Sequence, residues 1–230
     1  MIKIYFFKKF KILYILLLMN YLFSGIFIPD DNSSLNYRQI EFSWPQIPNS
    51  DSYQLTINDI NSDFILTINN ETNILIYDGY DLEWGESYSW QVCGYYNEDV
   101  LECHDEKYFS INELPEEKIP PIMEIITLDE NEIQNGITIF SGIFQQGAIG
   151  LGIDKFGEIL FYINHKICYK LLPNGNLLSI ATSQRAPGIQ ELTLNNNLIY
   201  NSPDLGFHHS AYKSKNNTYF GLVQEYQVHP

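Results

Sequence analysis

Short apolar runs, each ended by turn residues, are the feature that most constrains what this chain can fold into. After about residue 25, no segment keeps the apolar spacing of an amphipathic helix. Apolar and polar residues alternate instead, and clusters of Asn, Gly, Pro and Asp separate the runs. This pattern predicts an antiparallel all-β protein.

The N-terminal segment has a different character and indicates export. Four lysines precede an apolar run from Ile12 to Phe23, and Ser24 and Gly25 offer small residues for cleavage. Residues 1–25 are therefore predicted to be a signal peptide, and the protein to be periplasmic, secreted or on the cell surface. The apolar run is shorter than the roughly 20 residues of a transmembrane helix. An uncleaved signal anchor is the alternative, and it is the only membrane association that the sequence suggests.

Charge and missing motifs restrict the function. The chain has 28 acidic and 13 basic residues and a net charge of −15. Because nucleic-acid binding requires basic surface against phosphate groups, no nucleic-acid partner is expected. The sequence contains no glycine-rich nucleotide loop and no metal-ligand cluster. No cofactor and no metal site are therefore predicted.

The three cysteines divide into a pair and a single residue. Cys93 and Cys103 flank an acidic stretch and are equidistant from Glu98, so a hairpin centred there would place them opposite each other. In an oxidising compartment such a pair can form a disulfide, and two free thiols are the alternative. Cys168 lies in the apolar run 167–171 and is expected to be a small core residue.

Residues 36–112 form the first expected domain. Candidate strands cover 38–44, 53–58, 64–68, 74–77, 87–93 and 107–111, a spacing typical of an immunoglobulin-like sandwich. The stretches Phe42-Ser-Trp-Pro45, Tyr53-x-Leu-x-Ile57 and 82–92 resemble a fibronectin type III domain. The resemblance implies a central Trp44 and a buried Tyr88 whose hydroxyl bonds upstream backbone. It also implies a spacer or interaction module, not a catalytic one.

A Pro- and Glu-rich linker, 113–121, separates this domain from residues 122–230. The second part contains a weak repeat of apolar run, polar turn and apolar run, at 152–160, 170–178, 191–199 and 212–220. Two such hairpins make a four-stranded unit of about 40 residues, which is the spacing of β-propeller blades. Closed propellers have roughly four to eight blades. We therefore expect 122–230 to be a partial β-propeller, and the chain an N-terminal fragment.

Several side chains of the second part are candidates for function. His208 and His209 follow the turn-rich stretch 201–207 and open a strand. Because neighbours on a strand point to opposite faces, one histidine could face an axial channel. Arg185 lies in a loop, where it could meet an anion or be a solvated charge. Glu191 is expected to face outward, and Asp154 to be a turn residue.

Four stretches of this part are similar to the bacterial arylsulfotransferase family. They are Gly152-x-Asp-x-x-Gly157-Glu-Ile, Leu172-Pro-Asn-Gly175-Asn-Leu-Leu, His208-His209-Ser-Ala-Tyr-Lys and Asn216-Asn-Thr-Tyr-Phe-Gly-Leu-Val223. The chain departs from the family at Ser210, where an acidic residue is usual, and at Lys215-Asn216-Asn217, where the family has Pro-Asn-Gly. These departures put the partner that orients the imidazole in doubt.

The resemblance implies an enzyme that transfers a sulfuryl group from an aryl sulfate to a phenolic acceptor. It assigns His208 and His209 to binding the sulfuryl or phenolic oxygens. The nucleophilic histidine would lie in a later blade, beyond this chain, so the chain by itself would be catalytically incomplete. An exported enzyme fits aryl sulfate donors, because nucleotide sulfate donors are scarce outside the cytoplasm.

Two other functions remain open. One is a non-catalytic secreted protein whose sandwich and propeller bind protein or glycan partners. The other is a different periplasmic propeller enzyme, such as a lyase or a quinoprotein. Further blades with inward His and Arg would favour the sulfotransferase.

Overall fold

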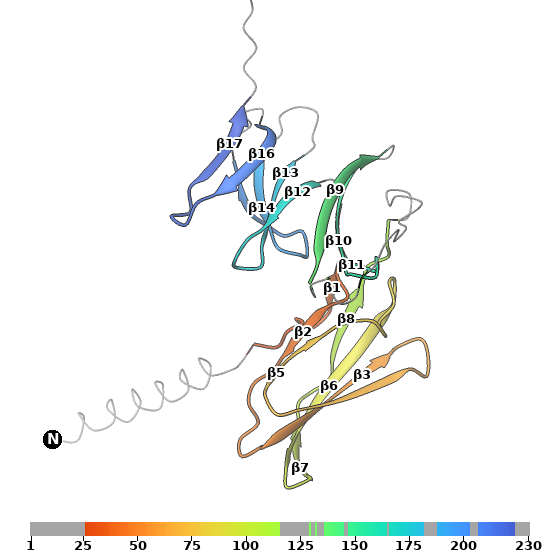
Figure 1. Cartoon of the computed structure of the whole chain (residues 1–230). Helices are drawn as coiled ribbons and strands as arrows, with labels where there is room; N and C mark the ends of the chain where they lie inside the picture. The colour runs from red at the N-terminus through yellow and green to blue at the C-terminus, as the bar shows by residue number, and fades with distance from the viewer. Residues whose placement is uncertain are drawn as a thin grey trace, which may run out of the picture. The chain divides into compact units, whose positions relative to one another are not determined.

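The structure, a computed structural model, describes residues 26–115, 129, 132, 136–144, 147–164, 166–181, 188–202 and 207–223 (Figure 1). The predicted signal peptide and most of the predicted linker lie outside these residues. Every regular element in the described ranges is a β-strand, and the strands form several antiparallel sheets. The all-β prediction is therefore confirmed. No helix long and apolar enough to cross a bilayer occurs in the part of the chain that the structure describes.

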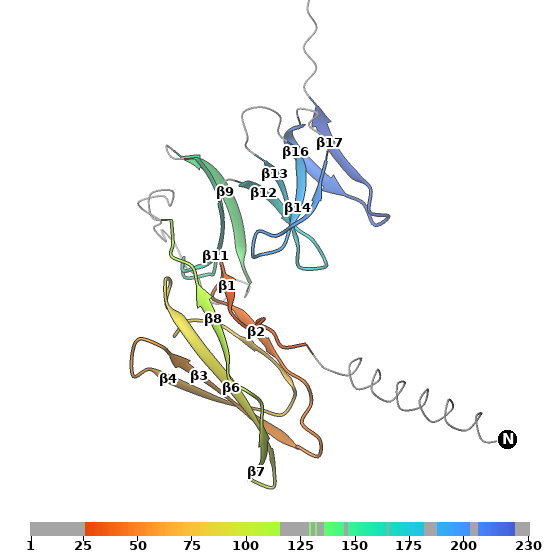
Figure 2. The same cartoon turned by 180° about the vertical axis from the view of Figure 1, so that it is seen from behind.

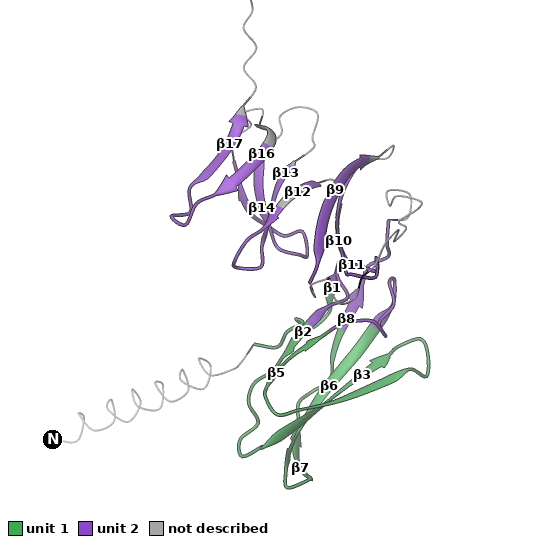
Figure 3. Cartoon of the chain, viewed as in Figure 1, with its two compact units in different colours: residues 1–33, 41–77, 88–108 green, residues 34–40, 78–87, 109–230 purple. Residues whose placement is uncertain are grey.

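The chain divides into two compact units that do not follow its linear order. The first comprises Met1–Ser33, Glu41–Tyr77 and Tyr88–Tyr108, and the second Ser34–Ile40, Asp78–Ser87 and Phe109–Pro230 (Figure 3). Two short stretches from the predicted sandwich domain, 34–40 and 78–87, therefore belong to the same unit as the C-terminal sheets.

Eight strands make up the N-terminal sheets. The larger sheet has the order β1-β8-β6-β3-β4, with β7 paired to β6, and β2 pairs with β5 in a second sheet. The strands are β1 Ser33–Leu35, β2 Ile40–Ser43, β3 Ser52–Asp59, β4 Ile65–Asn70, β5 Ile74–Tyr77, β6 Ser87–Tyr96, β7 Asp99–Cys103 and β8 Lys107–Ile111.

Alternation along β3 and β6 builds the core of the first unit. Tyr53, Leu55 and Ile57 are buried on β3, and Tyr88, Trp90 and Val92 are buried on β6, as the sequence predicts. The ring of Trp44 packs edge-on to Tyr53, with 5.4 Å between the ring centroids. The expected central tryptophan and buried tyrosine are both present.

A disulfide joins Cys93 to Cys103, which resolves the alternative that the sequence leaves open. The turn residues are Asn97 and Glu98, both with positive φ, so a regular hairpin would pair Cys93 with Glu102. A register shift beyond Gly94 adds one residue to β7 and brings Cys103 opposite Cys93 instead.

Removal of this disulfide is expected to destabilise the first unit by about 2–3 kcal/mol, because the unfolded chain gains the entropy of an open ten-residue loop. The test is denaturant unfolding of wild type and the Cys93→Ser, Cys103→Ser double variant, followed by tryptophan fluorescence. Dithiothreitol should lower the wild-type midpoint and leave that of the variant unchanged. Equal midpoints for all samples would contradict the expectation.

Three consecutive sheets form the C-terminal part of the second unit (Figures 1 and 2). Their strand orders are β11-β10-β9, β12-β13-β14-β15 and β16-β17, and all the pairings are antiparallel. The strands are β9 Thr138–Phe144, β10 Gly147–Ile153, β11 Ile159–Asn164, β12 Lys166–Leu171, β13 Leu177–Ala181, β14 Ile189–Leu192, β15 Leu198–Asn201, β16 Phe207–Lys213 and β17 Tyr219–Val223.

The same turn closes four of the hairpins and confirms the repeat. Each turn has five residues. The N–H of the first donates to the carbonyl of the fifth, and the carbonyl of the first accepts the N–H of the fourth. These first residues are Asp154, Leu172, Thr193 and Ser214. The residues three positions on, Gly157, Gly175, Asn196 and Asn217, all have positive φ. Only Gly and Asn adopt this conformation readily, which explains the recurring residue types.

Apolar side chains join these three sheets face to face. One cluster contains Phe161 and Ile163 of β11 together with Cys168, Leu177 and Leu192 of the next sheet. Cys168 is buried here, as predicted. A second cluster joins the other face of the middle sheet, through Leu172, Leu178 and Ile189, to Phe207, Ala211 and Tyr219. The middle sheet is therefore covered on both faces.

Candidate functional site

The predicted histidine pair lies at the start of β16, inside an irregular stretch of the strand. His208 pairs with Leu222, but the next pair in the ladder is Ala211 with Gly221. His209 and Ser210 therefore form a β-bulge. The predicted strand is present, but it is irregular at the histidine pair. Bulges interrupt the strict alternation of side chains and are frequent beside active sites, where they redirect a side chain.

Arg185, the other predicted contact to sulfate, lies at 182–187, outside the described residues. Of the predicted sulfate contacts, only His208 and His209 lie in the described part of the chain, both on β16.

A buried carboxylate holds the other end of this strand. Glu191 on β14 is 1% exposed, so the expectation that it faces outward is wrong. Its carboxylate accepts hydrogen bonds from Asn174, Asn176, Lys213 and Tyr219. Lys213 is the last residue of β16 and Tyr219 the first of β17. One carboxylate thus links a turn of the middle sheet to both strands of the last hairpin.

The protonation state of Glu191 follows from these bonds. Burial alone would raise its pKa, but the hydrogen bonds from Asn176, Lys213, Tyr219 and Asn174 outweigh burial and lower the pKa to about 2. The hydrogen bond to Glu191 in turn raises the pKa of Lys213. The pair is therefore fully charged at neutral pH. Tyr219 also stacks on Tyr200, with ring centroids 3.8 Å apart.

Next to this cluster, three lysines line an open cavity of about 350 Å³. Lys170, Lys213 and Lys215 stand around it with Tyr212 and Asn217. The cavity lies at the turn between β16 and β17, whereas the histidines lie at the opposite end of β16. At about 3.3 Å per residue the two places are some 15 Å apart along the strand. The lysines therefore do not complete the histidine site.

Asp154 is a turn residue, as predicted, and it also has a distant partner. Its Oδ1 accepts the backbone N–H groups of Phe156 and Glu158. Its Oδ2 accepts the hydroxyl of Tyr80, and this hydrogen bond raises the pKa of Tyr80 to about 12. The alternation of the sequence carries no signal for this contact, which joins residues 74 positions apart.

Among the described residues, no group of three or more His, Cys, Asp or Glu side chains is placed to hold a metal ion. Searches against protein-family models and against curated proteins find no match to this chain. What the second unit does must therefore be argued from its strands, its turns and the residues that they carry.

Proposed function

We propose that residues 122–230 form β-propeller blades of the arylsulfotransferase type, and that the protein transfers a sulfuryl group from an aryl sulfate to a phenol. The observation that carries the proposal is the series of stacked antiparallel sheets whose hairpins share one turn. Propeller blades are four-stranded antiparallel sheets, and β12–β15 has this strand number and pairing. The chain motifs 152–159, 172–178, 208–213 and 216–223 supply the likeness to this enzyme class.

The N-terminal sheets fit the accompanying module. We assign residues 36–112 to a fibronectin type III-like sandwich, supported by the buried Trp44 and Tyr88 and by the division of the strands between two sheets. Such a module positions or presents the catalytic part and contributes no reacting group.

The proposed reaction has two steps. A neutral imidazole nitrogen attacks sulfur, the bond from sulfur to the phenolic oxygen breaks, and the first phenol leaves as its anion. The oxygen of the second phenol then attacks the same sulfur, loses its proton to a base, and releases the imidazole. In both steps negative charge on the sulfuryl oxygens requires hydrogen-bond donors. In this proposal His208 and His209 supply such donors, and another histidine is the nucleophile.

The Glu191 cluster has a positioning role in this proposal. A donor aimed at a sulfuryl oxygen is effective only if its strand is fixed, because misplacement by about 1 Å costs a large factor in rate. Glu191 ties Lys213 at the far end of β16 and Tyr219 at the start of β17 to the middle sheet. The strand that bears the histidines is thereby anchored against its neighbour.

The test is a transfer assay on the natural protein that contains these residues, with p-nitrophenyl sulfate as donor and phenol as acceptor. His208→Ala and His209→Ala should each lower kcat/KM by about 100-fold or more, as the loss of one oxyanion donor does. Release of p-nitrophenol and formation of phenyl sulfate are measured together, so that transfer is distinguished from hydrolysis.

His104→Ala is the matched control, because it removes a histidine of the first unit whose ring hydrogen-bonds the Pro45 carbonyl. Its kcat/KM should equal that of wild type. Wild-type rates in both His208→Ala and His209→Ala would remove the histidine pair from the site, and absence of transfer by the wild-type protein would refute the proposed activity.

A further inference from the structure

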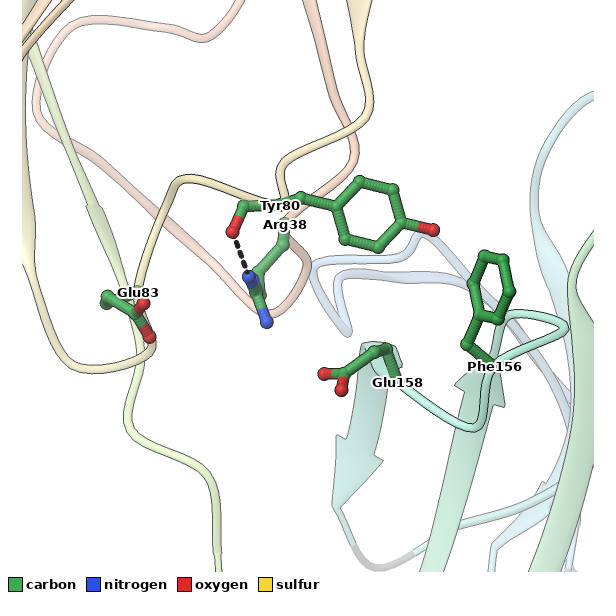
Figure 4. Close-up of a pocket in the computed structure, with 5 residues that line it drawn as sticks. All are labelled: Arg38, Tyr80, Glu83, Phe156 and Glu158. Atoms are coloured by element: carbon green, nitrogen blue, oxygen red, sulfur yellow. Dashed lines mark hydrogen bonds between the residues drawn. The ribbon is translucent and has the colours of Figure 1, made fainter. Parts of the chain in front are cut away.

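A cup of about 610 Å³, open to solvent, lies in the second unit and away from the histidine strand. Arg38, Tyr80, Glu83, Phe156 and Glu158 line it (Figure 4). All five residues belong to the second unit, from the segments 34–40 and 78–87 and from the turn between β10 and β11. Nothing in the proposed sulfuryl transfer uses these residues.

Arg38 forms the floor of the cup and is held rigidly. Its side chain is 7% exposed, its Nε donates to the carbonyl of Gly79 at 3.2 Å, and its Nη2 donates to the carbonyl of Tyr80 at 2.9 Å. Its backbone N–H donates to Leu160 of β11. Among the described residues, two neutral carbonyls accept from the guanidinium, and its five N–H donors leave further ones for a ligand in the cup.

Gly79 explains how the loop can approach Arg38 so closely. Its φ is +81°, and a Cβ at this position would lie 1.9 Å from the Arg38 carbonyl oxygen. No other residue type fits, because its Cβ would collide with the backbone of Arg38 and because its own backbone would have to adopt an unfavourable φ. The glycine at position 79 is therefore needed for the close contact between this loop and Arg38.

Two aromatic rings and two carboxylates complete the cup. Tyr80 is 45% exposed and Phe156 is 47% exposed, and in Figure 4 the carboxylates of Glu83 and Glu158 lie on either side of the guanidinium. Asp154 fixes this arrangement, since it accepts the Tyr80 hydroxyl and the backbone N–H groups of Phe156 and Glu158. The walls of the cup are therefore preorganised by one turn.

The chemistry of the lining selects the ligand. Arg38 brings a cation and Glu158 a carboxylate to the cup, and the ammonium group of Lys155 lies 5.0 Å from the centre of the Phe156 ring. Because charges of both signs lie at the cup and the whole chain is negative, a simple anion is not the favoured ligand. A neutral ring with hydroxyl groups suits this lining: its hydroxyls accept from Arg38 and donate to Glu158, and the apolar face of the ring packs on an aromatic side chain. We propose that this cup binds a sugar ring of a neutral glycan.

This proposal does not depend on sulfuryl transfer. It predicts a glycan-binding function that persists in protein whose histidine pair is changed. A zwitterion such as an amino acid is the competing ligand, because its carboxylate could meet Arg38 and its ammonium group a glutamate.

The test uses calorimetry and saturation-transfer NMR on the full chain. The probes are neutral hexasaccharides of glucose, mannose, xylose and N-acetylglucosamine, with leucine and p-nitrophenyl sulfate as separate arms. At least one hexasaccharide should bind saturably. Phe156→Ala and Glu158→Gln should each weaken its binding by about tenfold, a loss typical of one good contact.

Phe220→Ala and Glu102→Gln are the matched controls, because Phe220 is 54% exposed on β17 and Glu102 is exposed on β7. Both should bind as wild type does, and His208→Ala should as well. The proposal is overturned if no hexasaccharide binds, or if the Phe156 and Glu158 variants bind like the controls. It is also overturned if only leucine or p-nitrophenyl sulfate binds with sensitivity to Phe156→Ala.

Discussion

Glu191→Gln is expected to lower the stability of the second unit by about 2 kcal/mol, and its melting temperature by about 4–8 °C. The carboxylate is 1% exposed and accepts four hydrogen bonds, one of them from the ammonium group of Lys213. An amide of the same shape keeps the packing but removes the charge. It also replaces one acceptor oxygen with a donor, which then faces other donors.

The measurement is thermal unfolding followed by circular dichroism, with Glu102→Gln as the matched change at an exposed position. Lys213→Met alone and together with Glu191→Gln completes a double-mutant cycle. The cycle should show a coupling energy, because the two side chains contact each other. Equal melting temperatures for Glu191→Gln and Glu102→Gln would contradict the structural role of the buried carboxylate.

The pH dependence has a definite sign. The folded-state pKa of Glu191 is lowered from 4.5 to about 2, so its contribution to stability is fully present above pH 4.5 and is lost as the pH falls toward 2. A shift of this size corresponds to at most about 3 kcal/mol, and solvent at the neighbouring turn reduces it. The stability difference between wild type and Glu191→Gln should therefore narrow between pH 4.5 and 2.

Gly152→Ala is expected to destabilise the second unit by about 3 kcal/mol, near the upper end for overpacking. A Cβ on Gly152 would lie 2.0 Å from the ring of Phe161, its partner across the β10–β11 ladder. Phe161 is 3% exposed and belongs to the cluster that joins β11 to the next sheet. The ring would have to leave this cluster, and the two sheets would lose part of their common core.

Gly136→Ala is the control for this substitution, because nothing lies within 4 Å of the position that its Cβ would take. Chemical denaturation should give a lower midpoint for Gly152→Ala and an unchanged midpoint for Gly136→Ala. A Gly152→Ala protein as stable as wild type would show that Phe161 does not pack as described.

Local sequence patterns predict most of the strands and the repeated turn, but not the short strand β1. Alternation predicts the buried faces of β3 and β6, and the recurring Gly and Asn residues predict the repeated turn, because both depend on neighbours close in sequence. The burial of Glu191 is not predicted, because alternation assumes that one face of a strand is solvated, whereas β14 lies in a sheet that is covered on both faces.

The remaining differences come from bulges and long-range contacts. One extra residue in β7 brings Cys103 opposite Cys93, and a bulge includes His209, but no local residue pattern marks either irregularity. The cup depends on contacts between Arg38 and the loop at Gly79, 41 positions apart, and between Tyr80 and Asp154, 74 positions apart. Gly79 is the sequence signal for the close approach of its loop to the Arg38 backbone.

An NMR titration of the imidazole resonances with p-nitrophenyl sulfate tests most directly whether the histidine pair binds the sulfuryl group. Assignments come from the His208→Ala, His209→Ala and His104→Ala variants. Saturable shifts of the His208 or His209 resonances, with that of His104 unchanged, are the predicted result. Unchanged resonances for both His208 and His209 at concentrations that saturate the protein would contradict the proposed site.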